Sequence, residues 1–175
     1  MNLSGALKRV TGLVLMLFTV FVYGADNELR YRQAGHPLTS PAALTKLSFD
    51  EDDDIRERIA SNRKSPQEVL MRLAKDPATS VKISLATNLS APEEVYPILA
   101  SDDALAVRSV VARFEYVPIV ALAILAKDKD EDIRLEVARN LNSTKAILTL
   151  LSTDSHPQVK AIAELSILRL EEEKR

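Results

Sequence analysis

The sequence is short of the residues on which most enzyme chemistry depends. Its 175 residues include no Cys, no Trp, two His and four Gly. Without Cys the chain can form no disulfide, no cysteine-ligated zinc site and no thiol nucleophile, and two histidines argue against a histidine metal site or a Ser-His-Asp triad. All four glycines lie at or before residue 35, so the rest of the chain lacks the residue that hairpin turns and phosphate-binding loops favour. With 46% hydrophobic and 27% charged residues, the composition is that of a folded, helical protein.

The first 24 residues have the layout of a secretory signal peptide. Lys8 and Arg9 precede an apolar run over residues 10–22, and Val22 and Gly24 suit the two small-residue positions before a cleavage site. A run of this length covers about 20 Å as a helix, which is less than the roughly 30 Å of a bilayer core. We therefore expect residues 1–24 to be removed and the protein to be periplasmic or secreted, with an uncleaved membrane anchor as the alternative. Cleavage would remove two basic residues and no acid, so the net charge would change from −2 to −4.

A 26-residue repeat runs through the rest of the chain. At this offset one column is aliphatic, the next is basic, a third is Leu and a fourth is Asp. The members are Ile55, Val81, Val107, Ile133 and Val159; Arg56, Lys82, Arg108, Arg134 and Lys160; Leu73, Leu99, Leu125 and Leu151; and Asp76, Asp102, Asp128 and Asp154. A second apolar column follows the first by four residues, with Ala beside it, which places both on one face of a short helix.

Each repeat is predicted to contain two short helices. The first ends at Asn62 or its equivalents Asn88 and Asn140, because Asn tolerates the left-handed conformation that closes a helix. The second starts at Ser65-Pro66, an N-cap Ser followed by Pro at the first helical position, with Glu68 placed to close a capping box. Helices this short are marginal alone, so the units must stack. The predicted fold is all-α, an α-solenoid of about five 26-residue two-helix repeats.

The two ends of the array depart from the pattern. Residues 25–37 are expected to be a linker, and the solenoid domain then covers residues 38–175. It would begin with a half unit over residues 39–50, which contains only a second helix. It would end in a helix from Pro157 to about Glu171, followed by a charged tail. Atypical, polar terminal units are what a stacked array needs at its ends.

The string from Asp54 to Asp76 resembles a unit of the leucine-rich repeat variant family, and its Ile-Arg pair followed by an Ala-containing turn also resembles HEAT repeats. The resemblance is carried by Ile55-Arg56, Ile59-Ala60, Asn62, Ser65-Pro66, Leu70, Leu73-Ala74 and Asp76. It extends over about residues 38–170 and implies a superhelical scaffold that binds other molecules, with no catalytic residues. Variant-family units pair an α-helix with a 3₁₀ helix, whereas HEAT units use two α-helices, so the type of each second helix is left open.

The basic column has two interpretations. Arg56 and its equivalents could form a ladder for the phosphates of a nucleic acid. However, an Asp stands six residues before each of the last four members, so stacking can pair the two columns as structural ion pairs. We favour the ion pairs, which together with the acidic net charge argues against nucleic acid as a partner.

Two acidic clusters, Asp50 to Asp54 and Asp128 to Asp132, precede first helices of the repeat. In an exported protein they could hold Ca²⁺, but neither has the Gly-containing spacing or the terminal Glu of a calcium loop. Acidic residues at the start of a helix are favoured by the helix macrodipole. We therefore expect helix caps and no metal site. Neither His36 nor His156 has a partner at a spacing that suggests catalysis.

The third full repeat breaks the pattern. Phe114 replaces the closing Asn, Val117 replaces the Ser, and the second helix, over residues 117–126, contains no polar residue. Because a helix that is apolar all round is buried all round, we expect a central helix wedged between its neighbours; the alternative is an exposed apolar and aromatic patch. Aromatic and Arg residues dominate binding hot spots. The candidate partner-binding residues are Tyr96, Arg113, Phe114 and Tyr116, with core packing favoured for Phe114.

Three functions are compatible with the repeat. The favoured one is a non-enzymatic exported scaffold for an unidentified protein partner, with no catalytic residues, cofactor or metal. The second is a HEAT-like protein that processes a ligand or nucleic acid through carboxylates in a superhelical groove, although no paired-carboxylate motif supports it. The third is a structural protein of the cell envelope held by an uncleaved anchor, the one case in which we expect contact with a membrane. The sequence leaves the oligomeric state open.

Overall fold

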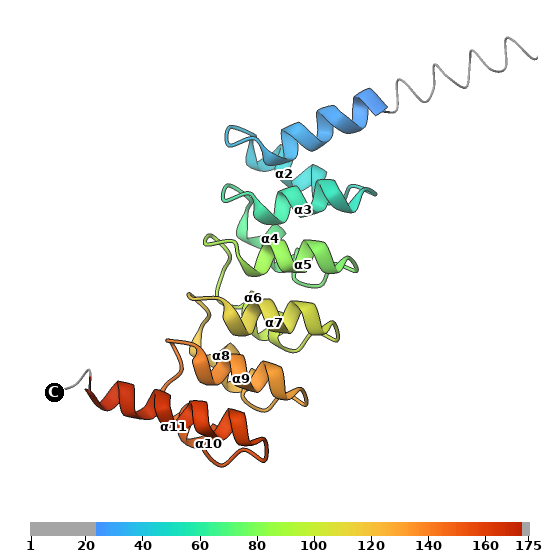
Figure 1. The fold of residues 1–175 in the computed structure, drawn as a ribbon. Coiled ribbons are helices and arrows are strands. Elements are labelled where there is room, and N and C mark those ends of the chain that lie inside the picture. The colour runs from blue at the N-terminus through green and yellow to red at the C-terminus, as the bar shows by residue number, and fades with distance from the viewer. Residues whose placement is uncertain (1–23, 173–175) are drawn as a thin grey trace, which may run out of the picture.

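The computed structural model describes residues 24–172, and within this range the regular structure is helical, with no β-strand. Figure 1 shows pairs of short helices stacked one after another along the described part of the chain. None of the helices in the described range is both long and apolar enough to cross a bilayer. The all-α class is thus confirmed, whereas the expected signal peptide lies, apart from Gly24, outside the described residues.

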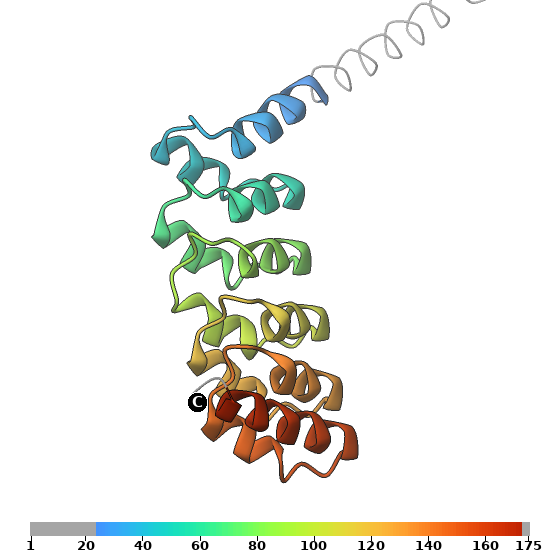
Figure 2. The same cartoon turned by 60° about the vertical axis from the view of Figure 1, so that its left-hand side comes forward.

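The helices alternate between two layers. One layer holds the first helix of each unit, namely a helix over residues 24–35, α3 (Asp53–Ser61), α5 (Thr79–Ala86), α7 (Leu105–Arg113), α9 (Glu131–Arg139) and α11 (Pro157–Glu172). The other layer holds the second helices, α2 (Pro41–Leu47), α4 (Gln67–Leu73), α6 (Val95–Ala100), α8 (Ile119–Leu125) and α10 (Lys145–Leu151). From α3 onward each first helix packs against the next first helix along the stack (Figure 1, Figure 2). All five second helices are α-helices.

The repeat columns form the core. Every member of the aliphatic column from Ile55 to Val159, and of the Leu column from Leu73 to Leu151, is at most 1% exposed. They belong to one continuous cluster that extends through the stack. Burying one such side chain stabilises the fold by about 1.5–3 kcal/mol. Much of the surface that covers them belongs to neighbouring units, which is why units of this size must stack.

The segment expected to be a linker is helical instead. Residues 24–35 form a first helix that pairs with α2, so the expected half unit is a complete one. Arg30 contacts Asp50 at 2.5 Å, with the same separation of 20 residues that the ion pairs of later units have. Ala34 is fully buried, as are Ala60 and its equivalents in the Ala column.

The helix over residues 24–35 is fixed against α3 by Arg58. The Arg58 guanidinium lies over the ring of Tyr31, 4.6 Å from its centre. It also lies within 2.8 Å of the place where a Cβ at Gly35 would stand, so a larger residue there would displace the flexible end of Arg58. This first unit is hard to recognise in the sequence because Gln33 stands where the later units have an aliphatic residue of the second apolar column.

The turns between first and second helices differ from the expectation. Asn62 has φ −75° and ψ 114°, and no described non-glycine residue has a positive φ. The Ser65 hydroxyl donates to the carbonyl of Ile59 at 2.7 Å, and α4 has Pro66 at its N-cap, without a side-chain cap bond. The predicted left-handed Asn and the predicted Ser cap are therefore wrong, although the helices end and begin within two residues of the expected positions.

Candidate functional site

A ladder of ion pairs runs along the turns that connect one unit to the next. In each unit a cation of the first helix reaches an Asp that follows the second helix. The pairs are Arg30–Asp50 at 2.5 Å, Arg56–Asp76 at 2.8 Å, Lys82–Asp102 at 2.5 Å, Arg108–Asp128 at 2.7 Å and Arg134–Asp154 at 2.7 Å. Lys160, the last member of the basic column, has no equivalent Asp to pair with, because no second helix follows α11 within the described residues.

The pairs of Arg56, Arg108 and Arg134 are more extensive than the Lys82 pair. Arg108 donates to both carboxylate oxygens of Asp128, at 2.7 and 3.3 Å, and to the carbonyls of Asp102 and Asp103. Lys82 contacts Asp102 through its Nζ alone. In the last pair, the hydrogen bond from the Arg134 guanidinium lowers the pKa of the Asp154 carboxyl. The structural interpretation of the basic column is confirmed, since its paired members have no charge left over for phosphates.

Amide side chains form a second ladder between neighbouring first helices. The side-chain nitrogens of Asn62, Asn88 and Asn140 donate to the carbonyl of the Ala 28 residues earlier, at 2.7–2.8 Å. Their side-chain oxygens accept the N–H two residues later. In α11 the Ser166 hydroxyl makes the equivalent bond to Ala138. Phe114 stands at this position after α7 and has no such donor, so the joint between α5 and α7 lacks an amide bridge.

The four candidate partner-binding residues come together only in part. Phe114 is stacked on Tyr96, with ring centres 5.9 Å apart, and meets Tyr116 edge-on at 5.8 Å. Tyr96 is 4% exposed, and burial raises the pKa of its hydroxyl. Tyr116 is 64% exposed and Phe114 is half-buried. Arg113 turns back along α7 and donates to Ser109, so it lies outside the ring stack.

The apolar second helix of the same repeat, α8, is buried on one side only. Its core side consists of Ala121, Leu122 and Leu125. On the other side Ile119 is 53% exposed and Val120 is 61% exposed. The predicted wedge between neighbours is therefore wrong for this side, and the alternative, an exposed apolar patch, is what α8 presents.

A comparison of columns could have found these residues. Ile119 and Val120 stand where the two preceding repeats have Gln67-Glu68 and Glu93-Glu94. Apolar residues at positions that are polar in the two preceding repeats indicate an exposed patch rather than a buried helix. Ile98, Ile124 and Leu150 stand 26 residues apart on successive second helices and continue the patch; Leu150 is 46% exposed. Together with Ile119 and Val120 they form what we call the apolar stripe.

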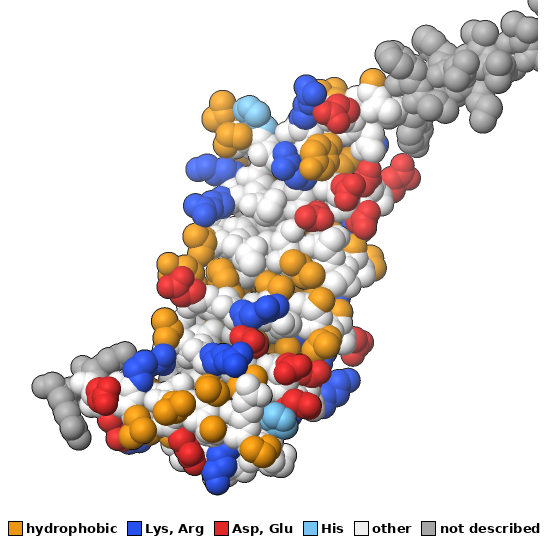
Figure 3. All heavy atoms as spheres, viewed as in Figure 1, with side chains coloured by type: hydrophobic (Ala, Val, Ile, Leu, Met, Phe, Trp, Pro, Cys, Tyr) orange, Lys and Arg blue, Asp and Glu red, His pale blue; other side chains and the backbone are white. Residues whose placement is uncertain are grey.

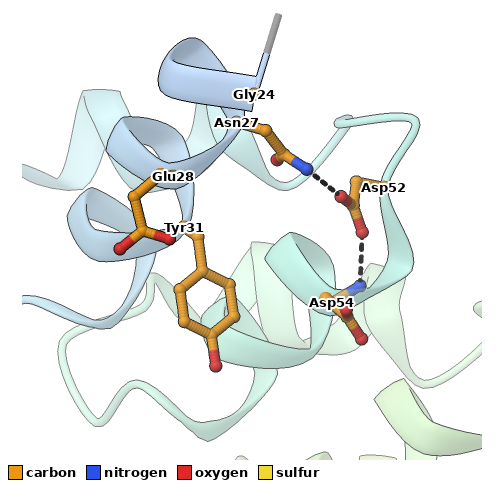
Figure 4. Close-up of a pocket in the computed structure, with 6 residues that line it drawn as sticks. All are labelled: Gly24, Asn27, Glu28, Tyr31, Asp52 and Asp54. Atoms are coloured by element: carbon orange, nitrogen blue, oxygen red, sulfur yellow. Dashed lines mark hydrogen bonds between the residues drawn. The ribbon is translucent and has the colours of Figure 1, made fainter. Parts of the chain in front are cut away.

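An acidic corner lies where the helix over residues 24–35 meets the start of α3 (Figure 4). Asp52 caps α3 by accepting the N–H of Asp54 at 3.0 Å, and it accepts a bond from the Asn27 amide at 2.7 Å. The bond from Asn27 above all lowers the pKa of Asp52. The carboxylates of Asp52, Asp53 and Asp54 lie within 4.8 Å of one another. Asp130 caps α9 in the same way, which confirms the predicted role of both acidic clusters as helix caps.

Comparison with known proteins gave no match, whether with family models, with curated proteins or with solved structures. The function must therefore be inferred from the residues. Two surface features bear on it. They are the apolar stripe and the exposed ring of Tyr116.

Proposed function

We propose that the chain is an exported α-solenoid of the HEAT-like or leucine-rich repeat variant type that serves as a non-enzymatic scaffold for a protein partner. The solenoid is supported by repeat columns that coincide with stacked helix pairs and by two ladders that join them. The α-helical second helices favour the HEAT type. Export to the periplasm or outside is supported by the signal-like residues 1–24. Cleavage after Gly24 would spare the contacts of Asn27 and Arg30 with the next unit.

The observation that carries the proposal is the apolar stripe. Exposed aliphatic side chains that gather in a patch mark interaction sites in soluble proteins. Val120 and Ile119 are more than half exposed on a helix whose other side is fully buried. The helix is thus held in place by the core, and the stripe is presented without any rearrangement of the stack. A preorganised apolar surface of this kind favours binding because little entropy is lost on association.

The alternative functions have less support. Catalysis by carboxylates needs free acids in a cleft, whereas Asp76, Asp102, Asp128 and Asp154 are engaged in ion pairs and Asp52 caps a helix. Nucleic acid binding needs free cations in a row, and the basic column supplies none between Arg30 and Arg134. An envelope protein with an uncleaved anchor would differ in its N-terminal segment alone and would keep the same stripe.

Site-specific photo-crosslinking tests the scaffold. A photoreactive residue at Val120 should give an adduct with another protein in intact cells that make this chain. Leu89 is a matched control, because it is 51% exposed on the turn before α6. An adduct at Leu89 but not at Val120 would place the partner elsewhere, and no adduct at any stripe position would overturn the proposal.

The aromatic candidates can be separated by two variants. Tyr116→Ser should leave the melting temperature unchanged, because the ring is mostly exposed, and should weaken the adduct at Val120 if Tyr116 belongs to the binding surface. Phe114→Asn with Tyr116→Ser should lower the melting temperature, because the stack of Phe114 on Tyr96 is lost. If the double variant melts like the wild type and also loses the adduct, Phe114 belongs to the site rather than the core.

A further inference from the structure

A hollow of about 600 Å³ is lined in part by the apolar stripe, at the C-terminal ends of α4, α6 and α8. Its apolar wall consists of Ala74, Pro97, Ile98 and Ile124. A second, smaller hollow adjoins it, shares Ser101 and Ile124, and extends to Lys127 and Lys129. The two form one groove that is open to solvent along the second-helix face.

Most acids of this groove are already neutralised. Asp76 pairs with Arg56, Asp102 with Lys82, and Asp128 with Arg108. These pairs belong to the ladder and hold the units together.

The cations of the rim are not neutralised in the same way. Lys75, Lys127 and Lys129 are exposed, and none of them has an ion pair within the described part of the chain. The one acid of the lining outside the ladder is Asp103. Three free ammonium groups against one free carboxylate leave the rim with an excess of positive charge.

The groove also has a direction. Val120, Ala123 and Ile124 lie on one side of α8 at i, i+3 and i+4, so they form a continuous apolar path from the start of the helix to the groove. At the start of α6 the exposed acids Glu93 and Glu94 lie at the other end of this face. A segment along the path would therefore meet acids at one end and lysines at the other.

We propose that this groove binds a short peptide segment of the partner, with aliphatic side chains followed by carboxylates. The aliphatic side chains pack on Pro97, Ile98 and Ile124, and the carboxylates reach Lys75, Lys127 and Lys129. The apolar wall selects a peptide rather than a polyanion, and the excess positive charge selects acids rather than bases. This inference rests on the proposed scaffold function and adds the chemistry of the partner.

Peptide pools of fixed composition test the chemistry without knowledge of the partner. We would label degenerate 12-residue pools with fluorescein and measure anisotropy with the full mature chain. One pool is rich in Leu and Glu, one in Leu and Lys, and one in Ser and Glu. We expect the Leu-Glu pool to bind at least tenfold more tightly than the other two, and its binding to weaken with salt.

Charge reversal supplies the control. Lys75→Glu with Lys127→Glu should shift the preference from the Leu-Glu pool to the Leu-Lys pool. Lys64→Glu, on the opposite turn between α3 and α4, should leave the preference unchanged. Equal binding of the Ser-Glu pool would show a cation surface only, and equal binding of the Leu-Lys pool would show an apolar surface only; either result overturns the proposal.

The crosslinking adduct separates this inference from the scaffold itself. If the charge-reversed variant keeps its partner adduct at Val120, the scaffold function stands and the acidic peptide is wrong. If the captured species is a second copy of this chain or its own residues 1–23, the partner proposed here is also wrong. If no peptide pool binds and no adduct forms at any stripe position, both proposals fail.

Discussion

Replacing Arg108 by Met tests whether the ion-pair ladder holds the units together. The side chains of Arg108 and Asp128 are 7% and 6% exposed, so the pair is almost completely removed from solvent. Met keeps the length of the stem but removes every donor, which leaves the Asp128 carboxylate buried without a cation. Breaking a buried pair by removing one partner costs about 3–5 kcal/mol. Because a domain has about 5–15 kcal/mol of stability in total, a large loss is expected.

The measurement is urea unfolding followed by helical circular dichroism. Arg113→Met is the matched control on the same helix; its side chain is exposed, and the change should cost within about 0.5 kcal/mol. Arg108→Met combined with Asp128→Asn should recover part of the loss, because the amide oxygen carries no charge and can still accept the N–H of Asp130, which bonds Asp128 at 3.0 Å. Equal unfolding midpoints for Arg108→Met and Arg113→Met would refute the role given to the ladder.

Three further predictions follow from the same geometry. Leu99→Ala should cost about 2–5 kcal/mol, since Leu99 is fully buried, and Glu93→Ala should cost within about 0.5 kcal/mol; equal urea midpoints would contradict the packing. The hydrogen bond from Arg134 holds the pKa of Asp154 in the folded state below its ordinary value of 3.8. The pair therefore stabilises the fold at pH values above 3.8, and this contribution is lost as the pH falls through the folded-state pKa. Asp154→Asn should therefore flatten the acid limb of the stability profile, and an unchanged limb would count against the pair. Intact-mass measurement of the protein recovered from the cells that make it should give an N-terminus near Ala25, whereas a retained Met1 would overturn the proposed compartment.

The core and the ion pairs could be predicted because both depend on residues that recur in register. Ile55 and Leu73 return every 26 residues as aliphatic side chains, and the fold buries every one of them. The Asp column pairs with the basic column for the same reason, since stacking places the same two positions together in each unit. A periodic fold allows such an inference because one correct contact implies all its equivalents.

Features that depend on a single unit could not be predicted in this way. The exposure of Val120 depends on which neighbours cover α8, and composition alone suggested complete burial. Asn62 was identified by its recurrence and does cap α3, but its backbone is extended rather than left-handed, and its side chain bridges to Ala34 in the preceding unit. The first unit was missed because Gln33 interrupts the column that would have revealed it. For Val120 and Asn62 the repeat gave the position of the residue correctly, and a neighbouring unit decided what that residue does.

The ion-pair ladder and the amide ladder both weaken at the same place, where the unit of α5 and α6 meets the unit of α7 and α8. Lys82 makes one contact with Asp102, where the Arg pairs next to it each make several. Phe114 replaces the amide bridge by a ring stack on Tyr96. Directional hydrogen bonds weaken steeply when their angles change, whereas packed rings can adopt several arrangements of similar energy. The groove lies at this joint, with Lys82 and its partner in its lining. A partner segment in the groove would therefore contact the stack where neighbouring units are least constrained by directional bonds, so that small adjustments between them cost the least.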